Sequence, residues 1–346
     1  MGQILLYGAY GYTGRLVTER AAARGLAPIL AGRNEGKLTD LAARYGDLPV
    51  RAFGLGEVGG NLEGVTTLLN LAGPFSRTAD PLARACMAAG IHYVDITGEI
   101  AVFETLHAFG PQAAAAGTVL LPGAGFDVVP SDCLAAHVHR RMPDAVSLEI
   151  VIGGLTELSR GTARTALESI DTGTKARRGG QIVTLPGTPR GTADLGRGLR
   201  PTVQMSWGDV ATAFWSTGIP DIDVYFEANE RLERVMRLPA AARWFLGTPP
   251  GRALANRAID RQPAGPDENM RASGRAVILA EATDAEGNRA ISELETPEAY
   301  RLTAMTALET ALRVDRGDAT AGFHTPSTAF GPDFVMSFPG VSRSDV

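Results

Sequence analysis

The feature that most constrains this chain is a glycine-spaced turn at its start. An apolar run, Ile4–Tyr7, is followed by Gly8, Gly11 and Gly14, and a helical pattern begins at Arg15. This order predicts a buried strand, a tight turn and a helix N-terminus, where unpaired amides and the helix dipole attract an anion. In a dinucleotide-binding unit, the three glycines permit the turn, admit the pyrophosphate and allow close helix packing. The alternative is a glycine-rich connector that binds nothing.

Short apolar runs alternate with helical patterns up to about residue 121. We expect strands at 28–31, 50–53, 66–71, 92–95 and 118–121, and helices at 15–24, 35–45, 79–89 and 100–116. This alternation predicts an α/β fold whose N-terminal part is a Rossmann domain with a doubly wound parallel sheet. Later expected strands, at 147–152, 221–226 and 275–280, alternate in polarity and look antiparallel. They favour a second, mixed α/β domain with a largely antiparallel sheet, one face of which is left open.

The length of 346 residues makes two domains the expectation. We expect a dinucleotide-binding domain over 1–142, a substrate or dimerisation domain over 143–296, and a C-terminal helix and tail over 297–346 that pack back on the first domain. Further expectations concern a helix over 162–176, a loop or irregular hairpin over 179–201, a loose region over 249–269, a helix over 297–313 and an irregular tail over 325–343.

The end of the second expected strand selects the dinucleotide. The strand ends in the segment Ala31–Asn34. Arg33 stands where NAD enzymes of this type have an acidic residue, and no carboxylate comes before Glu35. NAD enzymes of this type hold the ribose 2′-hydroxyl with an acidic residue, whereas an arginine suits the 2′-phosphate of NADP. Arg33 alone also fits an exposed loop arginine. The residues expected to bind NADP are Gly8, Ala9, Tyr10, Gly11, Tyr12, Thr13, Gly14, Arg33, Asn34, Ala72, Gly73 and Pro74.

Polar residues follow the fifth expected strand, beside the edge where the nicotinamide belongs. Tyr93, Asp95 and Glu99 are the candidate catalytic residues, and Glu99 has the alternative role of a helix cap. Asp127 is a further candidate, which we assign more readily to ordering its loop. No lysine lies four residues after Tyr93, so the arrangement of a short-chain dehydrogenase is absent. The proton donor therefore stays open between a side chain and a water.

Five motifs in order resemble the saccharopine dehydrogenase-like family, especially its bacterial branch with the mycobacterial trans-acting enoyl reductases. They are the segments Gly8–Gly14, Ala31–Arg33, Asn70–Phe75, Tyr93–Glu99 and Gly125–Asp132, and weaker similarity continues to Gly331. The resemblance implies an NADP(H)-binding Rossmann domain and a second domain that shapes the substrate cleft and often the dimer contact. The chain departs from the family at Tyr10, where Thr or Ser is common, and it is shorter than those enoyl reductases.

Composition narrows the class of partner. The net charge of −5 argues against nucleic acid or an anionic membrane as the main partner. The two cysteines are too few for a disulfide framework, and no apolar run approaches the roughly 20 residues of a membrane span. We expect no targeting segment, no metal site and a cytoplasmic location. His137 and His139 would point to different sides of a helix, so they do not form a metal site.

Two segments of the second half carry alternatives. The basic segment 175–200 is either a solvated loop or a lid that clamps an acidic or CoA-like substrate, with Arg177 and Arg178 as the clamp. The amphipathic segment 231–246 is expected to pack in the core or a dimer contact rather than touch a membrane.

We therefore expect an NADPH-dependent oxidoreductase that reduces a C=C, C=O or C=N bond of a small apolar or secondary-metabolite substrate. The alternatives are a saccharopine-type imine reductase acting on an amino acid and a non-catalytic NADP-binding protein. A homodimer through the second domain is a further expectation.

Overall fold

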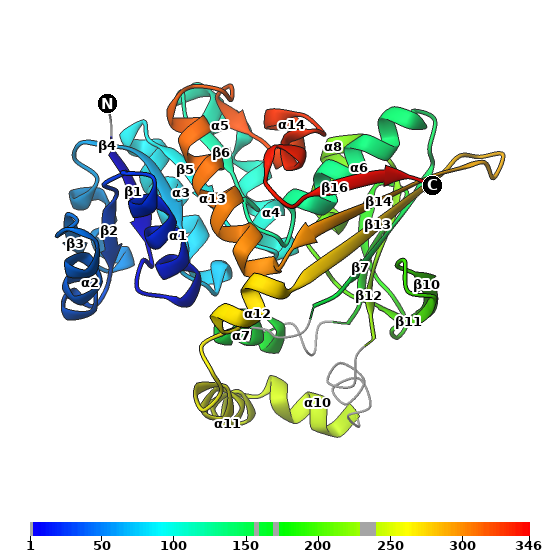
Figure 1. Cartoon of the computed structure of the whole chain (residues 1–346), viewed down its shortest axis with the longest axis horizontal. Helices are drawn as coiled ribbons and strands as arrows, with labels where there is room; N and C mark the ends of the chain where they lie inside the picture. Colours follow the sequence, from blue (N-terminus) through cyan, green and yellow to red (C-terminus); the bar gives the residue numbers. More distant parts are fainter. Residues whose placement is uncertain (1–2, 156–158, 169–172, 229–239) are drawn as a thin grey trace. The chain divides into compact units, whose positions relative to one another are not determined.

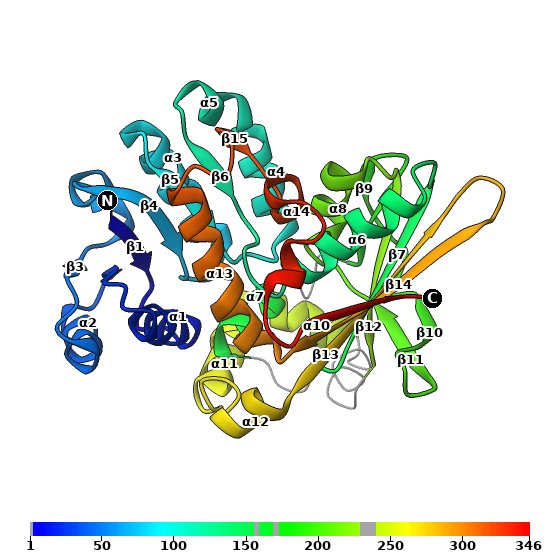
Figure 2. The same cartoon turned by 45° about the horizontal axis from the view of Figure 1, so that its top comes forward.

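The computed structural model describes residues 3–155, 159–168, 173–228 and 240–346. The chain divides into two compact units, one of Met1–Cys133 with Ala299–Pro339 and one of Leu134–Glu298 with Gly340–Val346. The first division falls inside helix α6 (Val129–Arg141). Each unit is built around its own β-sheet (Figure 1 and Figure 2).

The sheet of the first unit is parallel throughout, and its strand order within the described residues is β15-β6-β5-β4-β1-β2-β3. The strands are β1 (Gln3–Tyr7), β2 (Ile29–Gly32), β3 (Val50–Ala52), β4 (Val65–Asn70), β5 (His92–Asp95), β6 (Val119–Leu121) and β15 (Gly322–Phe323). The order reverses direction next to β1, as a doubly wound sheet requires. The predicted fold class is confirmed.

Both faces of this sheet are apolar because neighbouring residues of each strand point to opposite sides. Leu5 and Leu68 belong to one buried cluster, which includes Leu82 of α3. Leu6 and Leu69 belong to the other, on the face covered by α1, α2 and α13. Strands β1, β2 and β6 therefore read as largely apolar runs, typical of a buried parallel sheet.

The helices of the first unit are α1 (Tyr12–Ala23), α2 (Glu35–Ala42), α3 (Phe75–Ala89), α4 (Ile100–Ala108), α5 (Gly110–Ala115), α13 (Ala299–Asp315) and α14 (Pro326–Phe330). One helix was expected over 100–116, but the chain forms two. The break falls at Gly110 and Pro111, where proline has no N–H for the preceding turn and glycine weakens the helix. The tail expected to be irregular contains α14.

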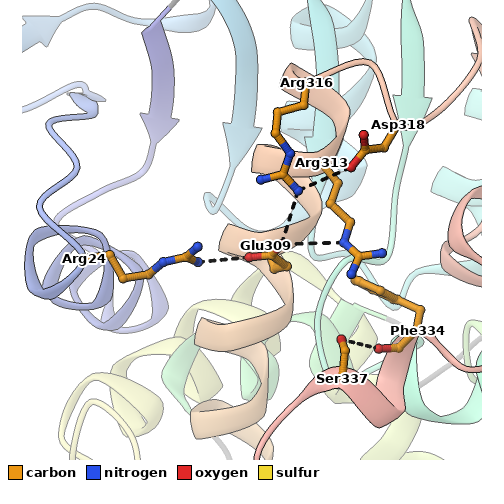
Figure 3. Close-up of polar contacts among 7 residues, drawn as sticks. All are labelled: Arg24, Glu309, Arg313, Arg316, Asp318, Phe334 and Ser337. Atoms are coloured by element: carbon orange, nitrogen blue, oxygen red, sulfur yellow. Dashed lines mark hydrogen bonds and ion pairs between the residues drawn. The ribbon is translucent and has the colours of Figure 1, made fainter.

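Helix α13 is held to α1 by a charged cluster around Glu309 (Figure 3). The Glu309 carboxylate accepts a hydrogen bond from Arg24 at 3.0 Å and pairs with Arg313 and Arg316 at 3.5 Å. Arg316 also contacts Asp318 at 3.3 Å. Each exposed pair contributes little by itself, but the shared carboxylate joins two helices distant in sequence. This cluster supplements the apolar packing of α13 on the sheet.

The second sheet is mixed. Its path of strands in the described chain is β10-β11-β12-β7-β13-β14-β16, and β8 joins β12 and β9. These strands are β7 (Ser147–Gly153), β8 (Lys175–Arg178), β9 (Gln181–Thr184), β10 (Arg190–Asp194), β11 (Leu199–Gln204), β12 (Asp221–Glu227), β13 (Arg275–Thr283), β14 (Arg289–Pro297) and β16 (Ser342–Asp345). Most pairs are antiparallel as expected, but β12 and β7 are parallel.

The helices of the second unit are α7 (Arg160–Glu168), α8 (Asp209–Thr217), α10 (Ala240–Gly247), α11 (Pro249–Asp260) and α12 (Glu268–Ser273). The expected loose region 249–269 is therefore largely helical. The helix expected over 162–176 is wrong at its end, because residues 175–178 form β8, and residues 169–172 lie outside the described residues.

The basic segment 175–200 is neither a solvated loop nor a clamp built from its paired arginines. The Arg177 guanidinium is buried, donates to the carbonyls of Val210 and Gly180 at 2.7 and 2.6 Å, and lies 4.2 Å from the Phe214 ring centre. Arg178 donates to both carboxylate oxygens of Asp223 at 2.8 Å. Both side chains are used in packing β8.

The expectation for segment 231–246 was packing in the core or in a dimer contact. Trp244 and Phe245 do not pack in the core, because their exposed fractions are 71% and 42%, and the dimer contact stays a prediction. Residues 231–239 lie outside the described residues. No helix in the described ranges is long and apolar enough to cross a membrane.

Candidate functional site

The glycine turn after β1 has the shape expected for a phosphate site. Gly8 has φ +86°, and a Cβ added there would lie 2.8 Å from the Cβ of Ala72. A Cβ at Gly14 would lie 2.4 Å from the Gly8 carbonyl oxygen. The Gly11 amide donates to that oxygen at 2.9 Å and closes the turn. Larger residues at Gly8 and Gly14 would separate β1, α1 and the strand-end turn of β4.

Helix α1 presents an N-terminus suited to an anion. Gly11 is its N-cap residue and offers no side-chain cap, and the first turn of α1 contains no acidic residue. The first amides of a helix have no partner within it, and the dipole makes that end positive. The residues present therefore fit a pyrophosphate, as the sequence predicts.

Two other residues expected to bind the cofactor lie in the same turn. Ala9 is buried, and Tyr12 packs edge-on against Tyr300 with ring centres 5.1 Å apart.

The Tyr10 side chain lies against the end of β2. A Cβ at Gly32 would lie 2.8 Å from Cε1 of the Tyr10 ring, so Gly32 makes room for that ring. Lys37 Nζ lies 5.7 Å from the ring centre, and Arg15 Nε donates to the Tyr10 carbonyl at 3.0 Å. The ring thus stands at the strand end that leads to Arg33.

Arg33 and Asn34 follow β2 with different local roles. Arg33 is exposed and forms no ion pair with a carboxylate in the part of the chain that the structure describes. It is close enough to Tyr7 that its positive charge partly offsets the rise that burial causes in the pKa of Tyr7. Asn34 is the N-cap of α2, where its Oδ1 accepts from the Lys37 amide at 2.9 Å. Both lie at the β1–β2 edge, as expected for contacts to the ribose end of NADP.

The turn after β4, which includes Ala72, Gly73 and Pro74, is held by a residue that the prediction of site residues did not include. Asn70 is buried; its Oδ1 accepts from the Ala72 amide at 3.0 Å and its Nδ2 donates to Thr78 Oγ1 at 3.1 Å. Thr78 Oγ1 donates to the Ala72 carbonyl at 2.7 Å. A buried amide at the end of an apolar strand was the available signal in the sequence, because such a group needs several partners.

Tyr93 and Asp95 form a buried network with Asn70. The Tyr93 hydroxyl accepts from Asn70 Nδ2 at 3.1 Å and donates to Asp95 Oδ2 at 2.8 Å. Asp95 Oδ1 accepts from the amides of Thr97 and Gly123 at 2.9 and 3.1 Å. Burial raises the pKa of Asp95 to about 6, and the amide hydrogen bonds limit this rise. Tyr93 and Asp95 are 0% exposed, so this network positions the strand-end loops without facing solvent.

Glu99 has the role of a helix cap, which was the alternative to catalysis. Its two carboxylate oxygens accept from the amides of Phe75 and Ser76 at 2.8 Å, at the first turn of α3. A carboxylate at this position satisfies orphan donors and complements the helix dipole. The contact also ties the β5–α4 loop to the turn after β4.

Asp127 is the carboxyl group of this edge with a pKa near neutrality and partial access to solvent. It lies in the loop between β6 and α6, and Gly98 leaves room for it, since a Cβ at Gly98 would be 3.0 Å from Asp127 Oδ2. Burial, together with the negative charge of Glu99, raises the pKa of Asp127 to about 7. A carboxyl group of this kind holds and releases a proton near neutral pH. In the described part of the chain, no group of His, Cys, Asp and Glu side chains is arranged to hold a metal ion.

Comparison with known proteins shows which proteins this chain is similar to. Residues 4–121 match the saccharopine dehydrogenase NADP binding domain. A trans-acting enoyl reductase of Mycobacterium tuberculosis (strain ATCC 25618 / H37Rv) is 26% identical over 402 aligned positions, covering 97% of this chain and 95% of the relative. A saccharopine dehydrogenase-like oxidoreductase of Rattus norvegicus is 28% identical over 162 positions, covering 40% of this chain and 38% of the relative. Apo saccharopine dehydrogenase (L-Glu forming) of Saccharomyces cerevisiae shares the fold, with a TM-score of 0.64 and 12% identity over 100% of both chains.

These matches make the chain similar to NADP-binding oxidoreductases. Residues 4–121 are similar to the saccharopine dehydrogenase NADP-binding domain, and the resemblance of the sequence motifs to the saccharopine dehydrogenase-like family is confirmed. The alignment with the mycobacterial relative has 402 positions and this chain has 346 residues, so the relative has residues that this chain lacks.

The buried network generates a prediction about stability and pH. The pKa of Asp95 is about 6 in the folded state, against the ordinary aspartate value of 3.8. Between these values the folded state keeps a proton that the unfolded state has released, so this group's contribution to stability falls as pH rises through that window. Asp95→Asn keeps the shape and removes the titration. The variant should therefore lack this falling component, which is on the order of 3 kcal/mol.

Urea unfolding followed by circular dichroism across this pH window measures the effect. Asp80→Asn, at a partly exposed position of α3 where the carboxylate pairs with Arg84, is the control that should keep the wild-type slope. Identical slopes for the wild type and Asp95→Asn would contradict the assigned pKa.

Proposed function

We propose that this chain is an NADPH-dependent reductase of a C=C, C=O or C=N bond in a small apolar or secondary-metabolite substrate. The relatives named trans-acting enoyl reductase align with 97% of the chain, which supports reduction of a carbon–carbon double bond first. Two alternatives remain, an imine reductase acting on an amino acid and a non-catalytic NADP-binding protein. Turnover measured on enone, ketone and imine panels distinguishes them from this proposal.

The observation that carries this proposal is the pairing of the uncapped α1 N-terminus with Arg33 at the end of the neighbouring strand. The amides at the start of α1 would hold the pyrophosphate, and Arg33 would hold the 2′-phosphate through charge-assisted hydrogen bonds. Ala72, Gly73 and Pro74 would lie beside the nicotinamide, because they follow the strand next to β1 at its carboxyl end. Bound NADPH would supply the hydride.

Among the acidic groups of this edge, we assign the proton-donating role to Asp127. Tyr93 and Asp95 are enclosed and bonded to each other, and Glu99 caps α3 with both oxygens. Asp127 has a partly exposed side chain, and its pKa of about 7 leaves it protonated in a substantial fraction of molecules at neutral pH. The three residues first expected to be catalytic then act as positioning residues for the loops around it.

The cofactor assignment predicts a selective loss of affinity in Arg33→Ala. Loss of a hydrogen bond to a charged group costs about 1.5–3 kcal/mol, so Kd for NADPH should rise about 10- to 100-fold while Kd for NADH stays the same. Fluorescence titration of purified protein with both cofactors measures this. Arg44→Ala removes an exposed arginine elsewhere in the same unit and should change neither value. Equal affinity of the wild type for NADPH and NADH would refute the NADP assignment.

The proton-donor assignment predicts a change in the pH profile of turnover. NADPH oxidation is first screened against enone, ketone and imine panels, and absence of turnover on every panel would favour the non-catalytic alternative.

With an active substrate, kcat of the wild type should fall as pH rises above about 7, because Asp127 loses its proton. Asp127→Asn should lower kcat about 100-fold and abolish that dependence. An unchanged profile in Asp127→Asn would remove Asp127 from the mechanism, and Asp80→Asn serves as the matched control.

A further inference from the structure

Two consecutive helices of the second unit carry an exposed apolar surface. Trp244 and Phe245 of α10 are 71% and 42% exposed, and Leu254 of α11 is 60% exposed. Single exposed apolar residues are ordinary, but a group of this size on neighbouring helices indicates an interaction site. We call residues 240–261, which span α10, α11 and the C-cap residue of α11, the α10–α11 lobe (Figure 1).

The lobe is attached to its unit through α11 and the residue that follows the lobe. Ile259 of α11 is buried, Arg160 of α7 donates to the Gln262 carbonyl at 2.7 Å, and Arg164 of α7 pairs with Asp260. The turn between the two helices is tight, since a Cβ at Gly251 would lie 2.0 Å from the Phe245 carbonyl oxygen. The exposed side chains therefore lie on a folded element with defined anchors.

The charge of the lobe is opposite to that of the whole chain. Arg257 and Arg261 follow Leu254 by three and seven residues, so they share its helix face, and both are exposed. The sequence from residue 240 to residue 261 contains four arginines, and Asp260 is its single carboxylate. That carboxylate is paired with Arg164. The net charge of −5 is thus carried elsewhere in the chain.

We propose that the α10–α11 lobe binds the surface of an anionic lipid bilayer. Exposed Trp, Phe and Leu beside arginines are the features of an element that lies in the interface between headgroups and acyl chains. Arginines near such a surface add electrostatic attraction to the apolar insertion. In a two-fold contact through this surface each positively charged lobe would face the same positively charged lobe of the other copy, so the charge pattern disfavours self-association here.

The amphipathic pattern of segment 231–246 fits burial in a core or a dimer contact as well as contact with a membrane surface. The exposed fraction of Trp244 argues against burial in the core of this chain. The proposal concerns how the protein is placed in the cell and does not depend on the reaction that it catalyses.

The test is binding of the full chain to vesicles of phosphatidylcholine with about 40% phosphatidylglycerol, followed by sedimentation and by tryptophan fluorescence. We expect binding at low salt, weakening in about 0.5 M NaCl, and a blue shift of emission on binding. Trp244→Ser with Leu254→Ser should lower the partition coefficient about tenfold or more and abolish the blue shift. NADPH affinity and the thermal midpoint of the double variant report that it is folded.

Leu199→Ser is the matched control, because Leu199 is 74% exposed on β11, outside the lobe, and its loss should leave vesicle binding unchanged. Equal sedimentation of the wild type and the double variant would overturn the proposal, as would the absence of wild-type binding. The rival role of this surface is contact with a second copy of the chain, which light scattering tests. If the wild type is a dimer that does not bind vesicles, and the double variant is a monomer, the surface is a dimer contact and the proposal is overturned.

Discussion

The close approach of three backbone segments at the carboxyl end of β1 is the constraint on which the site depends. Gly8 lies so close to Ala72 that a Cβ added at Gly8 would be 2.8 Å from the Ala72 Cβ. Gly14 allows α1 to pack closely against the Gly8 carbonyl. Without side chains at these points, the N-terminus of α1 and the turn after β4 meet at one edge. The partly buried N-terminus of α1 has no side-chain cap, which suits it to the proposed phosphate site.

The polar residues around this edge mainly hold it in shape. Asn70, Tyr93 and Asp95 share one chain of hydrogen bonds that ends on the amides of Thr97 and Gly123. Four strand ends and loops are thereby joined through buried groups, each of which has partners, and such networks specify one geometry. Tyr93, Asp95 and Glu99 all make hydrogen bonds that hold these strand ends and loops in place. The proposed proton donor, Asp127, lies outside this chain of hydrogen bonds as described, and its side chain is partly exposed.

The parallel sheet could be predicted from sequence because each strand is an apolar run followed by a turn signal and a helix, and the local patterns agree with the final fold. Strand β15 consists of Gly322 and Phe323 alone, and β16 is the polar segment Ser342–Asp345, so neither has a periodicity to detect. Strand β14 does alternate, with Ser292 and Leu294 buried, and was missed although the signal was present.

The site was predictable in part for a similar reason. The glycine turn is local in sequence, so its geometry could be predicted from the spacing of the glycines, and the cofactor contacts of these glycines and of Arg33 stay predictions. The role of Glu99 depends on where the first turn of α3 lies in space, and that of Asp95 depends on the distant amide of Gly123. Sequence shows that such groups are ionisable and near one edge. It does not show whether they face solvent or each other.

The most direct test of the account is amide hydrogen exchange of the full chain with and without NADPH. The account predicts slower exchange on NADPH binding in peptides that cover residues 8–16 and 31–37, with no change in a peptide that covers α7 (Arg160–Glu168). Unchanged exchange at residues 8–16 in the presence of saturating NADPH would contradict it, because the amides at the start of α1 are the proposed contacts of the pyrophosphate.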